Sequence, residues 1–294
     1  DSAYLAVKSR LVRTYRIVTN PPGAKVWYKP YTAPDSAWVL LGTTPLDSVI
    51  APLTIAGYEF FDSNRLRIEA PGYRTLDLVG LSWTDSVIQL DPEDRIPPEM
   101  VRVPAGPVRY TGASLGGGAV GSVPSFLMDR NEVTNREYQR FVDSGGYRRR
   151  ELWDTTFVLD GRQLSWEAAM ARMTDGTGRP GPSTWEGGAF PPGLQDHPVS
   201  GVSWYEAMAY ARFAGKSLPT LPHWIRAAST TGSAWIVPAS NFSGRGTVRT
   251  DSTLGLSAFG VRDAAGNVRE WTLNASGTDR FILGASHNDP PYVF

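Results

Sequence analysis

The chain has 294 residues, of which 41% are hydrophobic and ten are tryptophan, so it is long enough to bury a sizeable core and to form two domains. Lysine plus arginine and aspartate plus glutamate each number 29, and the resulting net charge of zero argues against nucleic acid or anionic membranes as general partners. The absence of cysteine excludes disulfides, thiolate metal sites and cysteine nucleophiles.

Residues 1–92 are predicted to form an N-terminal all-β domain. Alternating apolar residues predict strands over residues 10–19 and 24–31, joined by a turn at residues 20–23. Further strand-like runs cover residues 38–42, 59–73 and 85–90. Residues 93–99 are charged and rich in proline, which predicts a linker to a second domain at residues 100–294.

The second domain is predicted to be α+β, with two main helices and much coil. It opens with a predicted strand over residues 100–110, and three glycines at residues 116–118 predict a hairpin loop because no phosphate-loop residues follow them. Capping boxes predict the starts of the two main helices, and single caps predict two shorter ones. The four capping residues are Thr134 and Ser203 for the main helices, and Ser165 and Thr220 for the shorter ones. Loops and short strands are expected from residue 229 onward.

The stretch from Phe259 to Trp271 has too little amphipathic periodicity for a helix. Asp263 and Glu270 flank Gly266, which can turn the chain sharply enough to direct backbone carbonyls at a common centre. Hard cations such as Ca²⁺ prefer that mixture of carboxylate and carbonyl oxygens. Because the spacing is not that of an EF-hand, a loop without a metal remains the alternative.

Trp153, Trp166 and Trp185 lie in a polar, loop-rich region, where their rings could form the floor of a shallow recess. Core filling is the alternative for all three. The three histidines are far apart in the sequence and lack metal-ligand spacing, which favours structural roles for them. No Gly-x-Ser-x-Gly motif is present, so no serine nucleophile of that kind is predicted.

Several motifs in series resemble the formylglycine-generating-enzyme (sulfatase-modifying factor) superfamily. They are "MVRVPAGPV", "FLMDRNEVTNREYQRFV", "HPVSGVSWYEAMAYARFAGKSLPTLPHW" and "SNFSG", followed by "FGVRDAAGNVREWTLN" and "RFILGASHNDP". Their order and spacing match over residues 100–294, which implies a loop-rich domain with a C-type-lectin-like core. The chain looks most similar to a subgroup that accompanies a bacterial Ser/Thr kinase, although it carries no kinase motif itself.

In the N-terminal domain, "TNPPGAKVWY", "LGTTPL" and "LRIEAPGYRTL" resemble the PEGA module, a small β-sandwich of bacterial surface proteins and kinase ectodomains. The whole chain is thus expected to be α+β, with an all-β PEGA-like sandwich followed by a formylglycine-generating-enzyme-like domain. The resemblance implies a periplasmic or extracellular bacterial protein. Since the chain starts at Asp1 and not at methionine, a leader or an anchor is expected to have been removed.

The superfamily resemblance implies one structural Ca²⁺ as the cofactor. Its ligands would be the side chains of Asp263 and Glu270 and the backbone carbonyls of Gly266 and Val268. A second calcium loop of the superfamily follows an "NF" motif and needs an acidic residue downstream. Here "NFSG" runs into the basic stretch "RGTVRT", so a second calcium ion is not expected.

Oxidase members of the superfamily bind copper through two cysteines after the closing turn, and counting from Gly284 places Asp289 and Phe294 there. Neither a carboxylate nor a phenyl ring replaces the soft thiolates that copper(I) requires, so formylglycine-generating activity is not expected. The helical domain that supplies histidines in the iron-dependent sulfoxide-synthase relatives has no counterpart. Phe294 precedes the superfamily's closing "GFR" strand, so either more chain or another element is expected to complete the fold.

The sequence therefore favours a non-catalytic extracytoplasmic binding or scaffold module, such as an accessory subunit on the outer face of a bacterial membrane complex. The alternatives are a divergent metal-dependent enzyme of the superfamily and the ligand-sensing ectodomain of a Ser/Thr kinase. No apolar run approaches the roughly 18 residues of a membrane span, so none is predicted in this chain. A protein partner is expected, and nucleic acid is not.

The predicted partner contact is the apolar tail formed by Tyr292, Val293 and Phe294, together with the neighbouring Trp153 and Trp185. An exposed group of aromatic residues is typical of a protein interface, where such side chains act as anchors. The alternative for the tail is the ordered end of a longer chain.

The purified protein is expected to contain calcium and neither copper nor redox-active iron, because residues 263–270 are rich in oxygen ligands and thiols are absent. An ion at 100 times its Kd adds about 2.7 kcal/mol of stability, so chelation should lower the Tm and Asp263→Ala should abolish that response. Elemental analysis and thermal unfolding test both points. Stoichiometric copper or iron without calcium would contradict the site and the non-catalytic interpretation.

Overall fold

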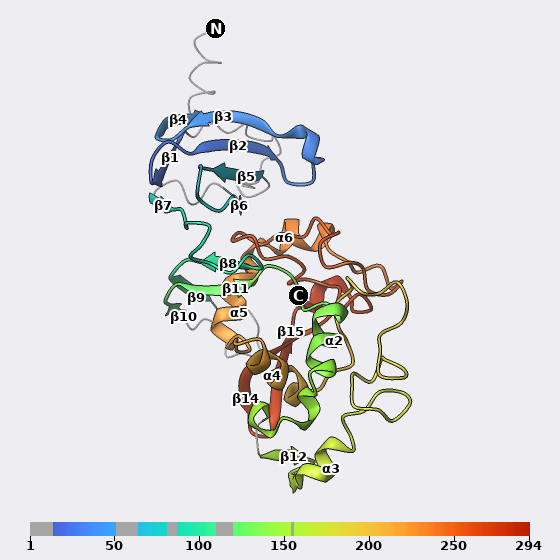
Figure 1. Ribbon diagram of the computed structural model, residues 1–294. Helices are drawn as coiled ribbons and strands as arrows, with labels where there is room; N and C mark the ends of the chain where they lie inside the picture. The colour runs from blue at the N-terminus through green and yellow to red at the C-terminus, as the bar shows by residue number, and fades with distance from the viewer. Residues whose placement is uncertain (1–13, 51–63, 81–86, 110–119, 154–155) are drawn as a thin grey trace.

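The computed structural model describes residues 14–50, 64–80, 87–109, 120–153 and 156–294. The predicted glycine loop at residues 116–118 and parts of the predicted strands at residues 10–19, 59–73 and 85–90 lie outside these ranges. Figure 1 shows a group of strands at the N-terminal end and a larger body below it that holds the α-helices. Among the described residues, no helix is long and apolar enough to cross a membrane.

In the part of the N-terminal domain that the structure describes, the strands form two sheets. In the first, β1 pairs antiparallel with β4 and parallel with β7, in the order β4-β1-β7. The second is antiparallel throughout, in the order β3-β2-β5-β6. The bounds are β1 Thr14–Asn20, β2 Lys25–Pro30, β3 Val39–Thr43, β4 Leu46–Ile50, β5 Asn64–Glu69, β6 Leu76–Val79 and β7 Val87–Gln89.

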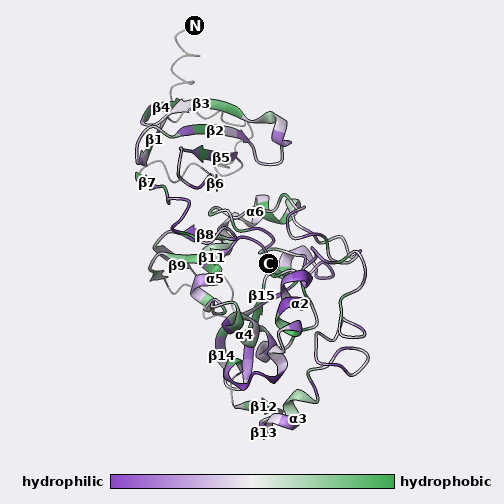
Figure 2. Ribbon diagram, viewed as in Figure 1, coloured by the Kyte–Doolittle hydropathy of each residue, from purple (hydrophilic) through white to green (hydrophobic). Residues whose placement is uncertain are grey.

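Both sheets contribute to one core. Ile17 of β1, Val26 of β2, Leu66 and Ile68 of β5 and Ile88 of β7 are all buried in the same cluster. The prediction of an all-β domain is therefore correct for the described residues, but β4 and β6 lie outside the predicted strand runs. The assignment of the domain to the PEGA module stays a prediction. Figure 2 shows that β3 is hydrophobic although it carries some of the most exposed apolar side chains of the domain.

The described residues of the C-terminal domain form four two-stranded antiparallel pairs, namely β8 with β11, β9 with β10, β12 with β13 and β14 with β15. The predicted single strand over residues 100–110 is instead split into β8 and β9 at Pro104, because proline has no N–H to donate to a ladder. The bounds are β8 Met100–Val103, β9 Gly106–Arg109, β10 Val120–Val123, β11 Phe126–Asp129, β12 Phe157–Leu159, β13 Arg162–Leu164, β14 Glu270–Ser276 and β15 Asp279–Leu283.

The helices start at the caps that the sequence predicts. Thr134 and Glu137 form one reciprocal capping box, and Ser203 and Glu206 form the other. The expectation of only loops and strands after residue 229 is wrong for α6, which has no side-chain cap to reveal it. The α-helices are α2 Asn135–Asp143, α3 Trp166–Met170, α4 Trp204–Phe213, α5 Leu221–Ala228 and α6 Ser233–Ile236. The 3₁₀ turns are Asp35–Ala37, Gly146–Arg148, Arg150–Leu152, Thr230–Gly232, Val237–Ala239 and Pro291–Val293.

The two domains are in direct contact through Tyr31. Its hydroxyl donates to the carbonyl of Leu256 (2.9 Å) and accepts from the backbone N–H of the same residue (2.6 Å). Tyr31, Val79 and Leu256 form a small buried cluster, and the Val79 N–H donates to the Ala258 carbonyl (3.3 Å). The tyrosine thus satisfies both backbone groups of a residue in the other domain.

The predicted linker is held at residues 96–98, although Ile96 is its one buried residue. The Arg74 guanidinium donates to the carbonyls of Ile96 (3.1 Å), Pro97 (2.7 Å) and Pro98 (2.7 Å). Ile96 is 4% exposed, so the segment is anchored by an apolar side chain as well as by hydrogen bonds. The linker therefore adds to the contact between the two domains.

Tyr31→Phe is expected to lower the free energy of unfolding by about 1–3 kcal/mol, because it leaves both backbone groups of Leu256 buried without a partner. Hydrogen exchange at the Leu256 amide should become faster. Tyr28→Phe is the control, since its hydroxyl bonds only within its own domain, to Asn64. If both variants changed Leu256 exchange equally, the proposed role of Tyr31 between the domains would be wrong.

Candidate functional site

The loop from Phe259 to Trp271 is held in the C-terminal domain by the side chain of Asn267, which has no exposed surface. Its amide nitrogen donates to Glu132 Oε2 (2.6 Å). Its amide oxygen accepts from the Val248 N–H (2.9 Å) and from the Asn241 amide (3.1 Å). One carboxamide therefore joins four segments of the chain.

Two glycines permit close packing between this loop and its neighbours. Gly266 has a φ of 78°, and a Cβ there would lie 2.4 Å from the Asn241 carbonyl oxygen. A Cβ on Gly284 would lie 2.7 Å from the carbonyl oxygen of Ala264. The Gly266 N–H donates to the Gly284 carbonyl (2.7 Å), so the closing turn is attached directly to the loop.

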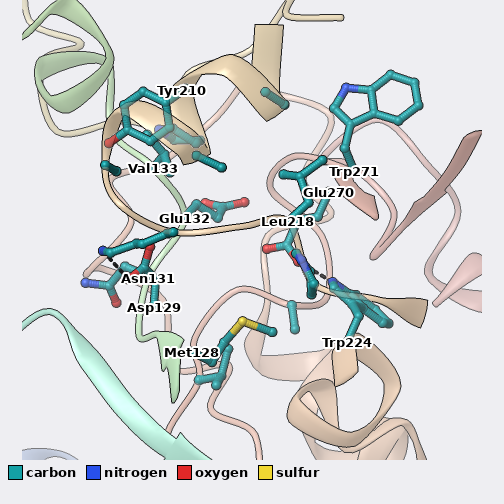
Figure 3. Close-up of a pocket in the computed structure, with 18 of the residues that line it drawn as sticks. Met128, Asp129, Asn131, Glu132, Val133, Tyr210, Leu218, Trp224, Glu270 and Trp271 are labelled. Carbon is teal, nitrogen blue, oxygen red and sulfur yellow. Dashed lines mark hydrogen bonds and ion pairs between the residues drawn. The ribbon is translucent and has the colours of Figure 1, made fainter. Parts of the chain in front are cut away.

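A cavity of about 430 Å³ lies beside this loop. Its walls come from β8 and β11, from α4 and α5 and from the loop itself (Figure 3). Most of the lining is apolar, and the alanines of α4 and α5 leave the space open because their side chains are short. The apolar lining includes Met100, Leu127, Met128, Val133, Val199, Val202, Ala207, Ala211, Leu218, Trp224, Ala227, Val261 and Trp271.

Three carboxylates line this cavity, those of Asp129, Glu132 and Glu270 (Figure 3). Asp129 is paired with Lys216 (2.6 Å), which leaves Glu132 and Glu270 as the two carboxylates of the lining without an ion pair among the described residues. Glu132 is 8% exposed and accepts from the Val268 N–H (3.1 Å) in addition to Asn267. Glu270 is half-buried and accepts a hydrogen bond from the indole N–H of Trp224. No lysine, arginine or histidine of the described residues forms an ion pair with either carboxylate.

Burial raises the pKa of both carboxylates. For Glu132, the pKa lies well above its usual range because of burial and then the negative charges of Asp263 and Glu270, against which its two hydrogen bonds act. For Glu270, burial raises the pKa to about 7, the Trp224 hydrogen bond opposes this and the charge of Asp263 adds to it. The cavity therefore holds acids that take up a proton far more readily than exposed glutamates.

Asp263 lies next to the cavity without lining it. The residue is 1% exposed, and its Oδ1 accepts from the Thr253 hydroxyl while its Oδ2 has no hydrogen-bond partner. Burial raises the pKa of Asp263 to about 7, whereas the Thr253 hydrogen bond and the charge of Arg262 lower it. A buried carboxylate oxygen without a partner is costly unless something binds it.

This donor chemistry fits the predicted calcium ion, since the unpartnered Asp263 oxygen, the Glu270 carboxylate and two loop carbonyls are all hard ligands. Among the described residues, no group of three or more His, Cys, Asp or Glu is placed to hold a metal ion. The predicted calcium site has only two acidic side chains, and its other ligands are the backbone carbonyls of Gly266 and Val268. Such a site does not require a group of three His, Cys, Asp or Glu residues. Calcium at this loop stays a prediction.

The position of Asp289, where the superfamily resemblance expects a copper cysteine, is occupied by an internal ion pair. Its carboxylate accepts from the Ser286 N–H (2.6 Å) and hydroxyl (2.7 Å), and from both Nε (2.8 Å) and Nη2 of Arg269. The Arg269 and Ser286 hydrogen bonds hold the pKa of Asp289 well below its usual range. Phe294, at the other position, packs against Trp224 with ring centroids 6.2 Å apart.

Trp153 and Trp185 do not reach the surface. They are 3% and 1% exposed, and their indole N–H groups donate to the Gly146 carbonyl and to Asn135 Oδ1, both at 2.9 Å. The prediction that these two rings contact a partner is therefore corrected, and core filling is right for both. Their rings belong to the aromatic core between α2 and α4.

The exposure of the side chains differs along the predicted tail. Tyr292 is 85% exposed and Val293 is 49% exposed, whereas Phe294 is only partly exposed and packs against the cluster that contains Trp224. The tail as a partner contact stays a prediction, with Tyr292 and Val293 as its accessible part.

Three residues of the site were not singled out from the sequence, namely Glu132, Asn267 and Arg269. Glu132 and Asn267 are 135 positions apart, and Arg269 and Asp289 are 20 apart, so no local pattern connects either pair. The signal that was available is their place in the motifs "DRNEVTN" and "AAGNVREW".

Trp224→Phe is expected to lower the free energy of unfolding by about 1–3 kcal/mol, because it leaves the Glu270 carboxylate without its indole donor. Trp235→Phe is the matched control, since that indole N–H is buried without a hydrogen-bond partner and its loss costs no bond. Urea denaturation of both variants measures the difference. Equal losses of stability would show that the Trp224 hydrogen bond contributes nothing.

Comparison with known proteins gives a family match over most of the C-terminal domain. The chain is 29% identical over 174 residues to serine/threonine-protein kinase pkn1 of Chlamydia pneumoniae, which covers 57% of this chain and 25% of that protein. It is 31% identical over 179 residues to hercynine oxygenase of Mycobacterium tuberculosis, and the match covers 52% of this chain and 38% of that protein. It is 33% identical over 152 residues to the formylglycine-generating enzyme of Thermomonospora curvata, and the match covers 44% of this chain and 48% of that protein.

The aligned part of the chain spans only a quarter to a half of the length of these curated relatives. The family model for the sulfatase-modifying factor enzyme 1-like domain matches residues 87–281, from β7 into β15. That match covers the loop, the cavity and the Glu132 and Glu270 carboxylates on its wall. The chain therefore belongs to the FGE-sulfatase family, whose members carry the sulfatase-modifying factor enzyme 1-like domain.

Proposed function

We propose that this protein is a non-catalytic extracytoplasmic binding or scaffold module, acting as an accessory subunit on the outer face of a bacterial membrane complex. The observation that carries the proposal is the set of hydrogen bonds that Asp289 makes. Its carboxylate is taken up by Arg269 and Ser286 at the position where the superfamily resemblance expects a copper ligand. The sequence contains no cysteine, so no thiolate pair can form anywhere in the chain.

The periplasmic or extracellular location rests on the PEGA-like motifs of the N-terminal domain. The contact between the domains supports a scaffold, because the Tyr31 hydrogen bonds and those of Arg74 to the linker connect the two domains directly. A structural calcium ion at Asp263 belongs to this proposal, with the partner contact at Tyr292 and Val293. The similarity to pkn1 favours, as a variant, the sensing ectodomain of a Ser/Thr kinase.

A divergent enzyme is the second candidate, and the observation that favours it is the presence of the Glu132 and Glu270 carboxylates in the cavity. Acids whose pKa is raised to about 7, as for Glu270, are suited to proton transfer near neutral pH. Relatives named as hercynine oxygenase and formylglycine-generating enzyme show that the family includes catalysts. The binding function is preferred because the thiolate chemistry of the copper-binding members is absent.

The purified protein, supplied with copper(I), oxygen and a cysteine-containing peptide substrate, is expected to leave the cysteine unchanged in mass spectrometry. The reason is that Asp289 and Phe294 offer no soft ligand for copper. A formylglycine-generating enzyme run in parallel provides the positive control. Turnover by this protein that disappears in Glu270→Gln would overturn the binding proposal and establish the enzyme alternative.

A further inference from the structure

A second, smaller cavity of about 30 Å³ lies between the two domains. Residues 74–77 and 89–91 line it from the N-terminal side, and β8, Arg130 and Gly260 line it from the C-terminal side. Figure 1 shows β8 and β11 at the end of the lower body that faces the N-terminal strands. Gly260 permits a close approach here, because its φ is 85° and a Cβ would lie 3.0 Å from the Asp77 carbonyl oxygen.

The three arginines that line this interdomain cavity differ in their partners. Arg102 is paired with Asp91 (2.8 Å), and Arg74 donates to three carbonyls of the linker. Arg130 has a buried Nε without a hydrogen-bond partner among the described residues. A guanidinium does not lose its proton in a protein, so the charge of Arg130 stays where burial makes it costly.

The surroundings of Arg130 hold more positive than negative charge. The two acids of the lining are already paired, Asp91 with Arg102 and Asp77 with Arg67 (2.9 Å). Burial lowers the pKa of Arg130 most, the charge of Asp77 opposes this, and the charges of three further arginines lower it again. The cavity therefore lies in a positive field that its own acids do not balance.

A second arginine at the domain boundary is in the same condition. Arg65 of β5 is 5% exposed, and its Nε also lacks a hydrogen-bond partner among the described residues. Its guanidinium lies over the Tyr31 ring, 4.6 Å from the centroid, and donates to the Leu254 carbonyl. These contacts are with neutral groups, so they leave the positive charge of the boundary uncompensated.

We propose that the interdomain cavity binds one chloride-sized anion, which accepts a hydrogen bond from Arg130 Nε and joins the N-terminal domain to the C-terminal domain. Thr75 and Gln89 line the same space, and their hydroxyl and amide groups can donate to the ion. The Gln89 amide oxygen accepts from Asn20 (2.9 Å), so its NH₂ group remains available as a donor. The ion would thus have donors from both domains. This inference goes beyond the proposed function, since it requires neither the partner nor calcium.

The size and the donors of the cavity favour chloride over a larger anion or a water molecule. A space of about 30 Å³ holds one or two groups of the size of water. Sulfate and phosphate bring up to two charges on four oxygens, which is more than one unpaired guanidinium balances. A water molecule would complete the Nε hydrogen bond but leave the charge of Arg130 unbalanced.

The test compares the Tm of the full chain in sodium chloride and in sodium gluconate at equal ionic strength. Gluconate is also monovalent but too large for the cavity, so the comparison separates binding from screening. We expect chloride to raise the Tm progressively, as a ligand of the native state does. It should also slow exchange of the Val79 N–H, which donates to Ala258 across the boundary. Line broadening of the ³⁵Cl NMR signal measures the Kd.

Arg130→Gln should weaken chloride binding about ten- to a hundredfold, because it removes the charge and the Nε donor. Arg162→Gln is the matched control, since it removes the same charge from an exposed position of β13 outside the cavity. Bromide soaked into crystals of the unaltered protein should give an anomalous peak between Arg130 and Gln89. That measurement does not depend on the folding of a variant.

Equal Tm values in the two salts, or equal chloride binding by the Arg130→Gln and Arg162→Gln variants, would overturn the inference. A crystal with water in place of bromide beside Arg130 would overturn it as well. Tighter binding of phosphate than of chloride at this site would contradict the assignment to a small monovalent ion. The copper assay of the proposed function is unaffected by each of these outcomes, so the two proposals fail separately.

Discussion

The carboxamide of Asn267 is the contact on which the arrangement of the C-terminal domain depends. It has no exposed surface, and it bonds to Glu132, Val248 and Asn241, which lie on three other segments. An apolar residue of similar size would leave a buried carboxylate and a buried backbone N–H with fewer partners, at a cost of about 1–3 kcal/mol for each unpaired group. A carboxamide offers two N–H donors and an acceptor oxygen at one position.

The same contact explains why the cavity is charged. Asn267 and the Val268 N–H hold Glu132 in place, and Trp224 holds Glu270, so both carboxylates stay at the wall of an apolar space. Acids in such a place are destabilising unless a cation or a proton accompanies them. Their raised pKa and the unpartnered oxygen of Asp263 are two results of one condition, a surplus of buried negative charge.

The chain carries the domain of its family and contains no cysteine. Gly284 and Gly266 preserve the close contact between the loop and the closing turn, which no larger residue would permit. At the position where the superfamily resemblance expects a copper ligand, the ion pair between Arg269 and Asp289 connects that turn to the loop.

The sequence by itself determined the elements whose signals are local. The capping boxes at Thr134 and Ser203 specify helix starts through contacts three residues apart, and the alternating strands of the first domain follow from a period of two. The motifs likewise identified the family, whose model matches residues 87–281, because a series of short matches needs no knowledge of the fold. The split of residues 100–110 at Pro104 was available from the same rules and was missed.

Only the tertiary structure decided which residues meet. Glu132 reaches Asn267 across 135 positions, and Tyr31 reaches Leu256 across 225, and no periodicity records such contacts. The sequence also did not decide which side chains are buried. A tryptophan in a polar stretch, such as Trp185, gives the same sequence pattern whether it fills a core or faces a partner. The cavity belongs to this second class, because it is space left between elements, and its volume depends on how they pack rather than on any one of them.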